Sequence, residues 1–442
     1  MVRKHLPRRS VPEARVVPKV RASYAAVVVG LTIVASVVGG IHLSGQASAR
    51  GVSAFLGSSG PKVVANITVG SEPNGVAYDS RTGEVFVANT GSGNVSVVCD
   101  GGPYCGADMK NKVVGTIAVG SNPYGATYDS AKGEIFVTHY NSAGSVAVIS
   151  DSTDKVLTTV PVGDAPAADL YDPGAGEVFA SNFGSGNVSV ISDATNKVVA
   201  NVGVGDGPYQ MAYDSAKGEI FVPSEDSSNV SVICDGSSAC GGAADLNKVV
   251  AVVALPTGSI PSGAGYDGAR GEVFVACDVG HGNVSVISDA TNAVVATVPV
   301  GSGSSTAVYD SMGEVYAPNY DSAAVSVISA ASNSVVATIG VGMEPAFAAY
   351  DPSQSEVFVS NYGSGNVTVI WDGSTPSTPG SSSSGSFLGL SASEGFAVGA
   401  LLGVVVGLAV GVGVGRLLLG KQRPAQGASA GGPPAPPPGA SP

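Results

Sequence analysis

Hydrophobic and polar residues alternate in four short segments of residues 62–100, and this arrangement recurs along most of the chain. The segments are KVVANITV (62–69), PNGVAY (73–78), GEVFVAN (83–89) and NVSVV (94–98). Alternation over such short runs is typical of β-strands, and the β-branched and aromatic residues of GEVFVAN favour a strand most strongly. Each unit contains one Tyr-Asp pair, and seven pairs occur: Tyr78-Asp79, Tyr128-Asp129, Tyr171-Asp172, Tyr213-Asp214, Tyr266-Asp267, Tyr309-Asp310 and Tyr350-Asp351.

The spacing of these pairs predicts the fold. Successive pairs are 50, 43, 42, 53, 43 and 41 residues apart. A repeat of roughly 40 to 45 residues with four short strands is typical of one blade of a β-propeller. We therefore expect an all-β fold, a seven-bladed β-propeller of four-stranded antiparallel blades, over residues 62–372. The last repeat lacks its outer strand, so residues 62–69 should supply it and close the ring.

Turn residues separate the predicted strands. Asp-Ser-x-x-Gly, at 79–83, 129–133 and 214–218, predicts a turn begun by the Asp side chain and closed by a glycine with positive φ. Gly-Ser-Gly-Asn, at 91–94, 184–187 and 363–366, predicts a tight hairpin. Proline stands five residues before the tyrosine in six repeats, where the innermost strand should begin beside the central channel.

The two ends of the chain differ from the repeats. Residues 1–23 are basic, 24–41 are apolar and 47–49 read Ala-Ser-Ala. This predicts a secretory signal over 1–49, either cleaved or kept as an anchor, and then a linker over 50–61. A Ser/Thr/Pro/Gly stalk is expected over 373–394. The uncharged apolar run 395–415, followed by Arg416, Lys421 and Arg423, predicts a transmembrane helix over 395–419 and a disordered cytoplasmic tail over 420–442.

Glycines recur at every fourth residue of this predicted transmembrane helix. Small residues at such spacing let two helices approach closely, so one expectation is a homo-oligomer formed in the membrane. The alternative is a single anchor that is merely rich in glycine. The glycines are Gly395, Gly399, Gly403, Gly407, Gly411 and Gly415. Together, the segments predict a single-pass protein of the cell membrane with an extracellular propeller.

Charge is distributed unevenly along the chain. The net charge is −13, yet eight of the 21 Lys and Arg lie within the first 50 residues and three more follow residue 372. The predicted propeller is therefore strongly acidic. A surface of that sign repels nucleic acid, so no nucleic-acid partner is expected, and solubility outside the cell is a sufficient reason for the charge.

The five cysteines fall into three places. Cys99 and Cys105 lie six residues apart in one of the two long repeats, and Cys234 and Cys240 lie six apart in the other. Two short-loop disulfides are expected in an oxidising exterior. A metal site needs further ligands, and no histidine is near in the sequence. Cys277 is left over, and a buried free thiol is its simplest interpretation.

One motif carries a family resemblance. VFVAN (85–89), IFVTH (135–139), VFASN (178–182), IFVPS (220–224), VFVAC (273–277), VYAPN (315–319) and VFVSN (357–361) are similar to the YVTN motif, together with the V-G-x-x-P-x-x-x-x-Y-D segments that precede them. Over residues 62–372 the chain resembles the YVTN β-propeller repeat family, common in archaeal surface-layer proteins. The resemblance implies a propeller at a cell surface and specifies no reaction.

Few residues offer chemistry at the predicted channel. Asp169 is the one carboxylate at a position that is otherwise Val, Ala or Met, and Tyr124, Tyr209 and His139 are further channel-facing candidates. Propellers resembling lactonases or streptogramin lyases use several converging Asp, Glu, Asn or His side chains, which these positions lack. We therefore expect no catalytic residue, no bound metal and no cofactor.

Six Asn-x-Ser/Thr sequences are candidates for glycosylation, because an extracellular turn exposes its asparagine. They begin at Asn66, Asn94, Asn187, Asn229, Asn283 and Asn366. The last five share one repeat position, which hairpin geometry alone also explains.

These features predict a non-catalytic binding or scaffold propeller of the cell surface, as an adhesion or surface-layer component. Its expected partners are cell-envelope proteins or glycans, and the cysteine-closed insertions are candidate contact surfaces. The alternative is a channel-centred, metal-dependent hydrolase or lyase, in which Asp169 would be essential. A third hypothesis, a ligand-sensing subunit of a membrane complex, needs a partner that the short tail barely suggests.

Overall fold

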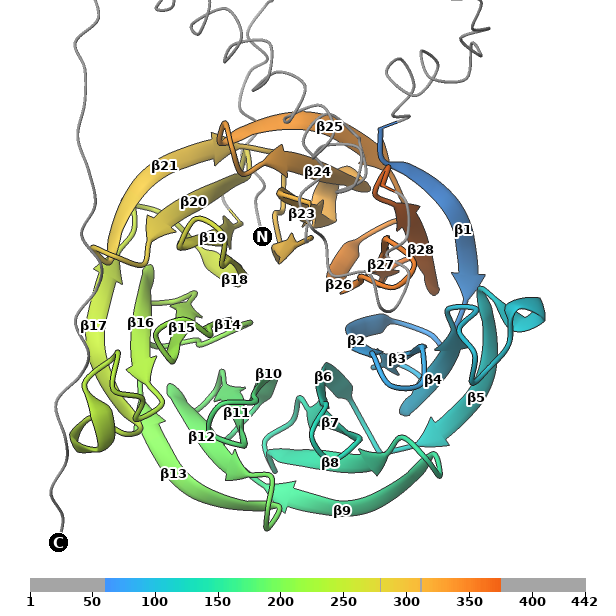
Figure 1. Cartoon of the computed structure of the whole chain (residues 1–442), viewed down its shortest axis with the longest axis horizontal. Coiled ribbons are helices and arrows are strands. Elements are labelled where there is room, and N and C mark those ends of the chain that lie inside the picture. Colours follow the sequence, from blue (N-terminus) through green and yellow to red (C-terminus); the bar gives the residue numbers. More distant parts are fainter. Residues whose placement is uncertain (1–59, 279, 311, 375–442) are drawn as a thin grey trace, which may run out of the picture. The chain divides into compact units, whose positions relative to one another are not determined.

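A computed structural model describes residues 60–278, 280–310 and 312–374, which form a seven-bladed β-propeller (Figure 1). Every blade is a four-stranded antiparallel sheet, and the innermost strands surround the axis of the ring, where the channel was predicted. The predicted fold class is thus confirmed for the propeller. The predicted signal, nearly all of the predicted linker and stalk, the predicted transmembrane helix with its glycines, and the predicted tail lie outside the described residues. Within the ranges that are described, no helix is long and apolar enough to span a membrane.

The blades are numbered in chain order, and the strands of each blade are given from the innermost to the outermost. Their strands are, in blade 1, β2 (Pro73–Asp79), β3 (Glu84–Asn89), β4 (Asn94–Cys99) and β5 (Lys112–Ala118); in blade 2, β6 (Pro123–Asp129), β7 (Glu134–His139), β8 (Ser145–Ser150) and β9 (Lys155–Pro161); in blade 3, β10 (Pro166–Asp172), β11 (Glu177–Asn182), β12 (Asn187–Ser192) and β13 (Lys197–Gly203); in blade 4, β14 (Ala212–Asp214), β15 (Glu219–Ser224), β16 (Asn229–Cys234) and β17 (Lys248–Ala254).

The remaining strands are, in blade 5, β18 (Pro261–Asp267), β19 (Glu272–Cys277), β20 (Asn283–Ser288) and β21 (Ala293–Pro299); in blade 6, β22 (Val308–Tyr309), β23 (Glu314–Asn319), β24 (Ala324–Ser329) and β25 (Ser334–Gly340); and in blade 7, β26 (Pro345–Asp351), β27 (Glu356–Asn361), β28 (Asn366–Trp371) and β1 (Lys62–Thr68). Three short 3-10 helices, η1 (Ala107–Met109), η2 (Gly242–Ala244) and η3 (Tyr320–Ser322), lie in connections.

The ring closes as the repeat pattern predicts. β1 pairs antiparallel with β28, from Lys62 opposite Trp371 to Thr68 opposite Asn366. The Thr368 hydroxyl donates a 2.8 Å hydrogen bond to the Asn66 side chain across this seam. The first strand of the domain thus covers the edge that the last strand would otherwise expose.

The hydrophobic core lies between neighbouring blades. Seven clusters of buried apolar side chains each join two blades. In one of them, Phe86 and Ala88 of β3 pack with Ile135 and Val137 of β7, because alternate residues of a strand point to opposite faces. The E-V-F-V-A-N pattern therefore turns its Phe toward the next blade and its valines toward the previous one.

Strand register gives the ring two distinct faces. Pro73, Asn89, Asn94 and Ala118 lie at one end of blade 1, because they pair with one another in sequence. The Tyr-Asp pair lies at the other end. All blades repeat this arrangement, so we call the two ends of the ring the proline face and the Tyr-Asp face.

The predicted turn chemistry is present at the Tyr-Asp face. Asp79 Oδ1 accepts hydrogen bonds from the backbone N–H groups of Arg81 and Thr82, at 2.7 and 3.1 Å, and Gly83 has a φ of 73°. The Tyr78 hydroxyl donates to Ser353 of blade 7 at 3.2 Å. The Tyr-Asp pair therefore both closes a turn and links adjacent blades.

Candidate functional site

Aromatic side chains from four blades meet at the channel mouth on the proline face. Together with residues of blades 1 and 6, they line a pocket of about 230 Å³. Its lining consists of Asn74, Tyr124, Tyr209, Ser305, Tyr320, Ala346, Phe347 and Tyr362. We call this the aromatic pocket. It is concave and mostly aromatic, with a few polar groups, which are the general properties of a ligand site.

Contacts across the channel hold the pocket together. The Tyr124 hydroxyl of blade 2 and the Tyr209 hydroxyl of blade 4 form a hydrogen bond. The Phe347 ring of blade 7 lies 6.1 Å from the Tyr124 ring and 6.3 Å from the Tyr209 ring, centroid to centroid. Tyr140 and Phe183 extend the cluster, with the Tyr140 ring 4.9 Å from Tyr124. The pocket floor is therefore fixed by residues far apart in the sequence.

Polar groups in the pocket are neutral and in part unpartnered. Asn74 is 2% exposed, and its Oδ1 atom is buried with no hydrogen-bond partner. Burial raises the pKa of the Tyr124 and Tyr209 hydroxyls, which therefore stay protonated. Tyr320 donates a 3.2 Å hydrogen bond to Glu344 at the pocket edge. The pocket thus offers hydrogen-bond acceptors and aromatic faces, with no cation of its own.

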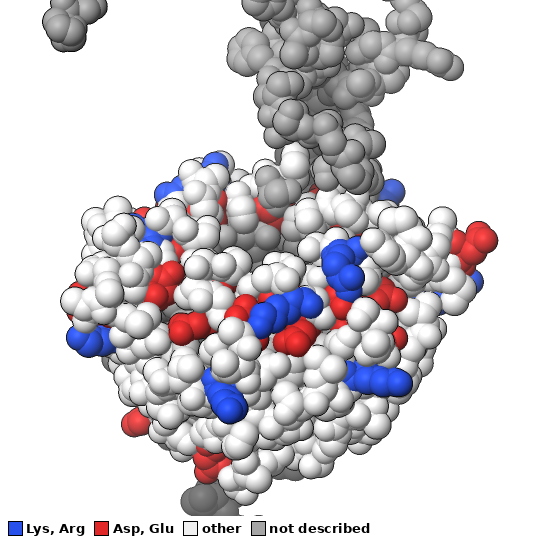
Figure 2. Space-filling view, turned by 60° about the horizontal axis from the view of Figure 1, so that its bottom comes forward, with Lys and Arg blue, Asp and Glu red and all other residues white. Residues whose placement is uncertain are grey.

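The two faces of the ring differ in their basic residues. The ten Lys and Arg of the described residues all lie at or near the Tyr-Asp face, at the starts of outer strands and in the connections there. Several pair with acids, as Lys132 does with Asp193 at 3.7 Å. Figure 2 shows basic and acidic side chains lying together on one side of the ring, amid largely uncharged surface.

The connections of the proline face carry acids without bases. They contain eight carboxylates and one histidine, His281, among the described residues. The carboxylates are those of Glu72, Asp164, Asp206, Glu225, Asp226, Asp278, Asp321 and Glu344. The aromatic pocket therefore opens on a face whose described connections carry carboxylates and no Lys or Arg.

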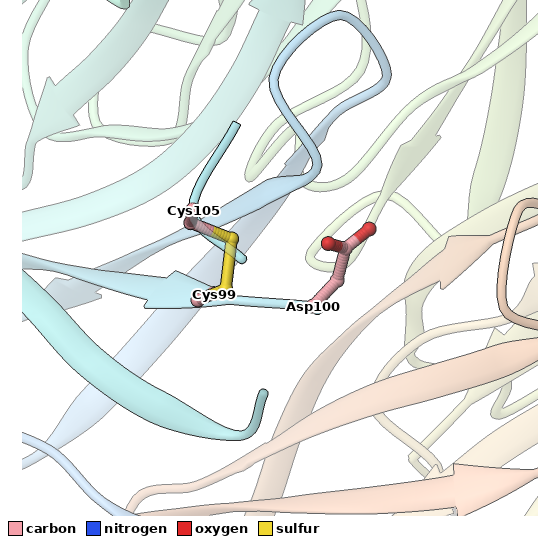
Figure 3. Close-up of side chains that lie close together, drawn as sticks. All are labelled: Cys99, Asp100 and Cys105. Carbon is pink, nitrogen blue, oxygen red and sulfur yellow. A yellow bond between two sulfur atoms is a disulfide. The ribbon is translucent and has the colours of Figure 1, made fainter. Parts of the chain in front are cut away.

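Both predicted disulfides are present, and they lie on the Tyr-Asp face. Cys99–Cys105 and Cys234–Cys240 close loops between the third and fourth strands of blades 1 and 4. Figure 3 shows Asp100 beside the first disulfide. Burial raises the pKa of Asp100 to about 6, although the Gly102 N–H donates to it at 2.5 Å. The insertions therefore lie away from the aromatic pocket.

A larger hollow, of about 450 Å³, adjoins the second disulfide loop between blades 3 and 4. It is lined mainly by Gly, Ala and Ser, with Tyr213, Lys217 and Asp235. Small side chains supply little area for a ligand to contact and few directed groups. For that reason we assign the candidate site to the smaller aromatic pocket.

Two of the four channel-facing candidates, Tyr124 and Tyr209, meet in this pocket, and the other two lie elsewhere. Asp169 of β10 is 8% exposed, and both its carboxylate oxygens are buried without a hydrogen-bond partner. A Cβ atom added to Gly125 of blade 2 would lie 3.1 Å from Asp169 Oδ1, so this carboxylate faces the neighbouring blade. Burial raises its pKa well above the usual range.

His139 occupies the position that asparagine holds in four other blades. Its Nδ1 atom lies 3.1 Å from the Ser145 hydroxyl and its Nε2 atom 3.0 Å from the Val119 carbonyl. In blade 1, Asn89 Nδ2 likewise donates to Asn94 Oδ1 at 2.8 Å. Burial lowers the pKa of His139. The histidine therefore joins the ends of strands, as the motif asparagine does.

The glycosylation candidates are spread over two places. Asn94, Asn187, Asn229, Asn283 and Asn366 begin the third strand of their blades at the proline face, and Asn66 lies exposed on β1. In three hairpins the motif asparagine donates to the side-chain oxygen of the sequon asparagine, at 2.7 to 2.8 Å. These sequons therefore have a structural use in addition to any modification.

The described residues present two groupings that resemble metal ligand sets. They are Cys99, Asp100 and Cys105, and Cys234, Asp235 and Cys240. In both, the sulfur atoms are joined in a disulfide, which removes the thiolates that a metal would bind. Cys277 is a buried free cysteine, and burial raises the pKa of its thiol.

Much of the pocket was not predicted from the sequence. Tyr140, Phe183, Tyr320 and Tyr362 each directly follow the last residue of a YVTN-like segment, where the chain reaches the proline face. The recurrence of aromatic residues at this repeat position could have indicated an aromatic cluster on one face of the ring. Asn74, Ser305 and Phe347 lie in or beside inner strands, where composition alone does not distinguish lining residues from core.

Comparisons with known proteins support the class defined by the fold, a seven-bladed β-propeller. No protein-family model matches the chain, so the YVTN resemblance stays a prediction from its residues. No curated protein matches it either. Among solved structures, the chain is similar to hydrazine synthase of Kuenenia stuttgartiensis, with a TM-score of 0.58 and 17% identity, over 67% of this chain and 95% of that one. At this identity the likeness concerns the fold alone.

Proposed function

We propose that this protein is a non-catalytic binding propeller displayed outside the cell and held by a single C-terminal membrane anchor. The observation that carries the proposal is the aromatic pocket at the channel mouth. It has a ligand site's shape and lining, and it lacks the paired nucleophile and base, or acid and base, that a reaction needs. The YVTN-like repeats of the chain favour a place among cell-envelope proteins.

The remaining parts of the proposal agree with this role. Two disulfides suit an oxidising compartment, and the second strand of each blade is almost fully buried, so the repeats serve chiefly to build the ring. The seven repeats differ from one another mainly in the connections between strands, which is where propellers and other scaffolds carry their binding residues.

Membrane topology is tested by labelling intact cells that express the full-length chain with a membrane-impermeant, amine-reactive reagent. The exposed lysines Lys112, Lys155, Lys197 and Lys248 should be labelled, and Lys421 in the predicted tail should be labelled only after permeabilisation. Mass spectrometry of the tryptic peptides gives both yields in one sample. Labelling of Lys421 with protection of the propeller lysines would refute an extracellular propeller.

A further inference from the structure

We propose that the aromatic pocket binds a small organic ammonium ion that carries at least one N–H group. This inference rests on the proposed binding function and specifies the chemical class of the ligand. Three independent features of the described residues support it: the aromatic walls, the sign of the charge around the mouth and an unpartnered acceptor inside.

The aromatic walls favour a cation. Tyr124, Tyr209, Tyr320, Tyr362 and Phe347 all line one pocket of about 230 Å³. The face of an aromatic ring is negative, so several rings around one cavity attract an alkylammonium group and also contact its methylene groups. A carboxylate ligand would meet the same negative faces and be repelled.

The charges around the pocket also favour a positively charged ligand. Eight carboxylates and no Lys or Arg occupy the described connections of the proline face. Glu344 accepts the Tyr320 hydroxyl at the pocket edge. Burial, and then the charges of Asp226 and Asp278, raise the pKa of Glu225, whose charge also acts on Tyr124 and Tyr209. A bound cation would relieve this repulsion between acids.

The unpartnered acceptor specifies the N–H group. Asn74 is almost fully buried, lines the pocket and leaves its Oδ1 atom without a donor. A buried acceptor of this kind is costly until a ligand supplies the missing hydrogen bond. A primary ammonium group supplies it, whereas a quaternary ammonium group does not.

Isothermal titration calorimetry on the full-length chain in a nonionic detergent tests the proposal with n-butylammonium. Four matched compounds are titrated in parallel: n-butanol, butyrate, tetramethylammonium and methyl α-glucoside. We expect n-butylammonium to bind one to one, tetramethylammonium to bind more weakly, and the neutral and anionic compounds to give no saturable heat. Equal binding of butanol, of tetramethylammonium or of the glucoside would overturn the proposal, as would the absence of butylammonium binding.

Variants locate the binding. Tyr362→Leu removes one aromatic face and should weaken butylammonium binding by about 2- to 30-fold. Glu225→Gln keeps size and removes charge, and should weaken it by roughly 2- to 5-fold. The matched controls Tyr104→Leu and Asp108→Asn change an exposed tyrosine and an exposed acid in the loop that joins β4 to β5, and should leave the affinity unchanged.

Equal effects of pocket and control variants would place the binding elsewhere and refute the assignment. Thermal unfolding of each variant shows whether the propeller is intact, and Glu225→Gln gives an independent result if Tyr362→Leu fails to fold. Failure of the lysine-labelling experiment refutes the extracellular propeller, whereas failure here, with the labelling pattern as expected, refutes only the ligand class.

Discussion

At the residue scale, one repeat position shows how context changes the meaning of a side chain. The position holds Asp169 in blade 3 and Val76, Ala126, Met211, Ala264, Ala307 or Ala348 in the others. The sequence identified Asp169 as the exception and as a candidate for the channel. In the structure, the equivalent side chains belong to the apolar clusters between blades. The carboxylate of Asp169 is therefore buried beside a neighbouring blade.

This burial predicts that Asp169→Ala stabilises the propeller at neutral pH. The free energy of unfolding should rise by about 1 to 3 kcal/mol, because an unpartnered buried polar group is removed and alanine is what four other blades carry. Because burial raises the pKa of Asp169 in the folded state, the wild type binds more protons folded than unfolded and gains stability as the pH falls.

Denaturant unfolding of both proteins at pH 7.5 and pH 5 measures this effect. The advantage of Asp169→Ala should be largest at pH 7.5 and shrink in acid, as the wild-type carboxylate becomes protonated in the fold. Asp169→Asn separates the loss of charge from the loss of volume. A variant less stable than the wild type at pH 7.5 would show that this carboxylate has a partner or a role that its contacts do not reveal.

At the element scale, the strands were predictable and the contacts between connections of different blades were not. Each YVTN-like segment, such as residues 85–89, forms most of the second strand of its blade, because alternation and β-branched residues both favour a strand there. The aromatic residue that follows the motif, such as Tyr140 or Tyr362, lies in a connection between strands. Its place in a pocket depends on contacts between blades that sequence spacing alone does not specify.

The disulfide loop of blade 4 gives a second prediction. Cys234 pairs with Lys248 just as Ser192 pairs with Lys197 in blade 3, so the four-residue turn Asp193–Asn196 fits the same strand ends. Cys234→Ser with Cys240→Ser should cost about 2 kcal/mol, because the long loop loses its cross-link. Grafting Ser-Asp-Ala-Thr-Asn over residues 234–247 should cost less, because a short turn needs no cross-link.

The graft also preserves the local contacts that matter. It keeps an aspartate where Asp235 accepts the Tyr213 hydroxyl, and an asparagine where Asn247 has a φ of 55°, as Asn196 has one of 49°. Denaturant unfolding of the three proteins under oxidising conditions gives the comparison. If the graft is destabilised at least as much as the cysteine variant, the loop itself, rather than its disulfide, stabilises blade 4.

At the scale of the whole molecule, counting the strands of the seven repeats predicted both the ring and its closure. The absence of Lys and Arg from the described connections of the proline face was not predicted with them. Net charge and its distribution along the chain showed an acidic propeller, but each repeat sends connections to both faces. The antiparallel strand order of each blade places Glu72 and Glu344 at one face and Arg81 and Lys132 at the other.

Closure of the ring predicts that its seam opens first. Ile67 of β1 and Ile117 of β5 occupy the same position in their blades, and both are 5% exposed. Ile67→Ala and Ile117→Ala should each cost about 2 to 5 kcal/mol through lost burial and a residual cavity. The two outer strands differ in how the chain joins them to their partners. β5 follows β4 directly along the chain, whereas β1 is joined to β28 only through the rest of the ring.

Hydrogen exchange on the full-length variants distinguishes the two sites. Ile67→Ala should speed exchange locally in β28, at residues 366–371, because a weakened β1 can detach without unfolding the other blades. Ile117→Ala should speed exchange in β4 much less, since the connection of residues 100–111 and its disulfide keep β5 near its partner. Equal local exchange in the two variants would mean that the seam is as firmly held as a hairpin, and that the ring opens as one cooperative unit.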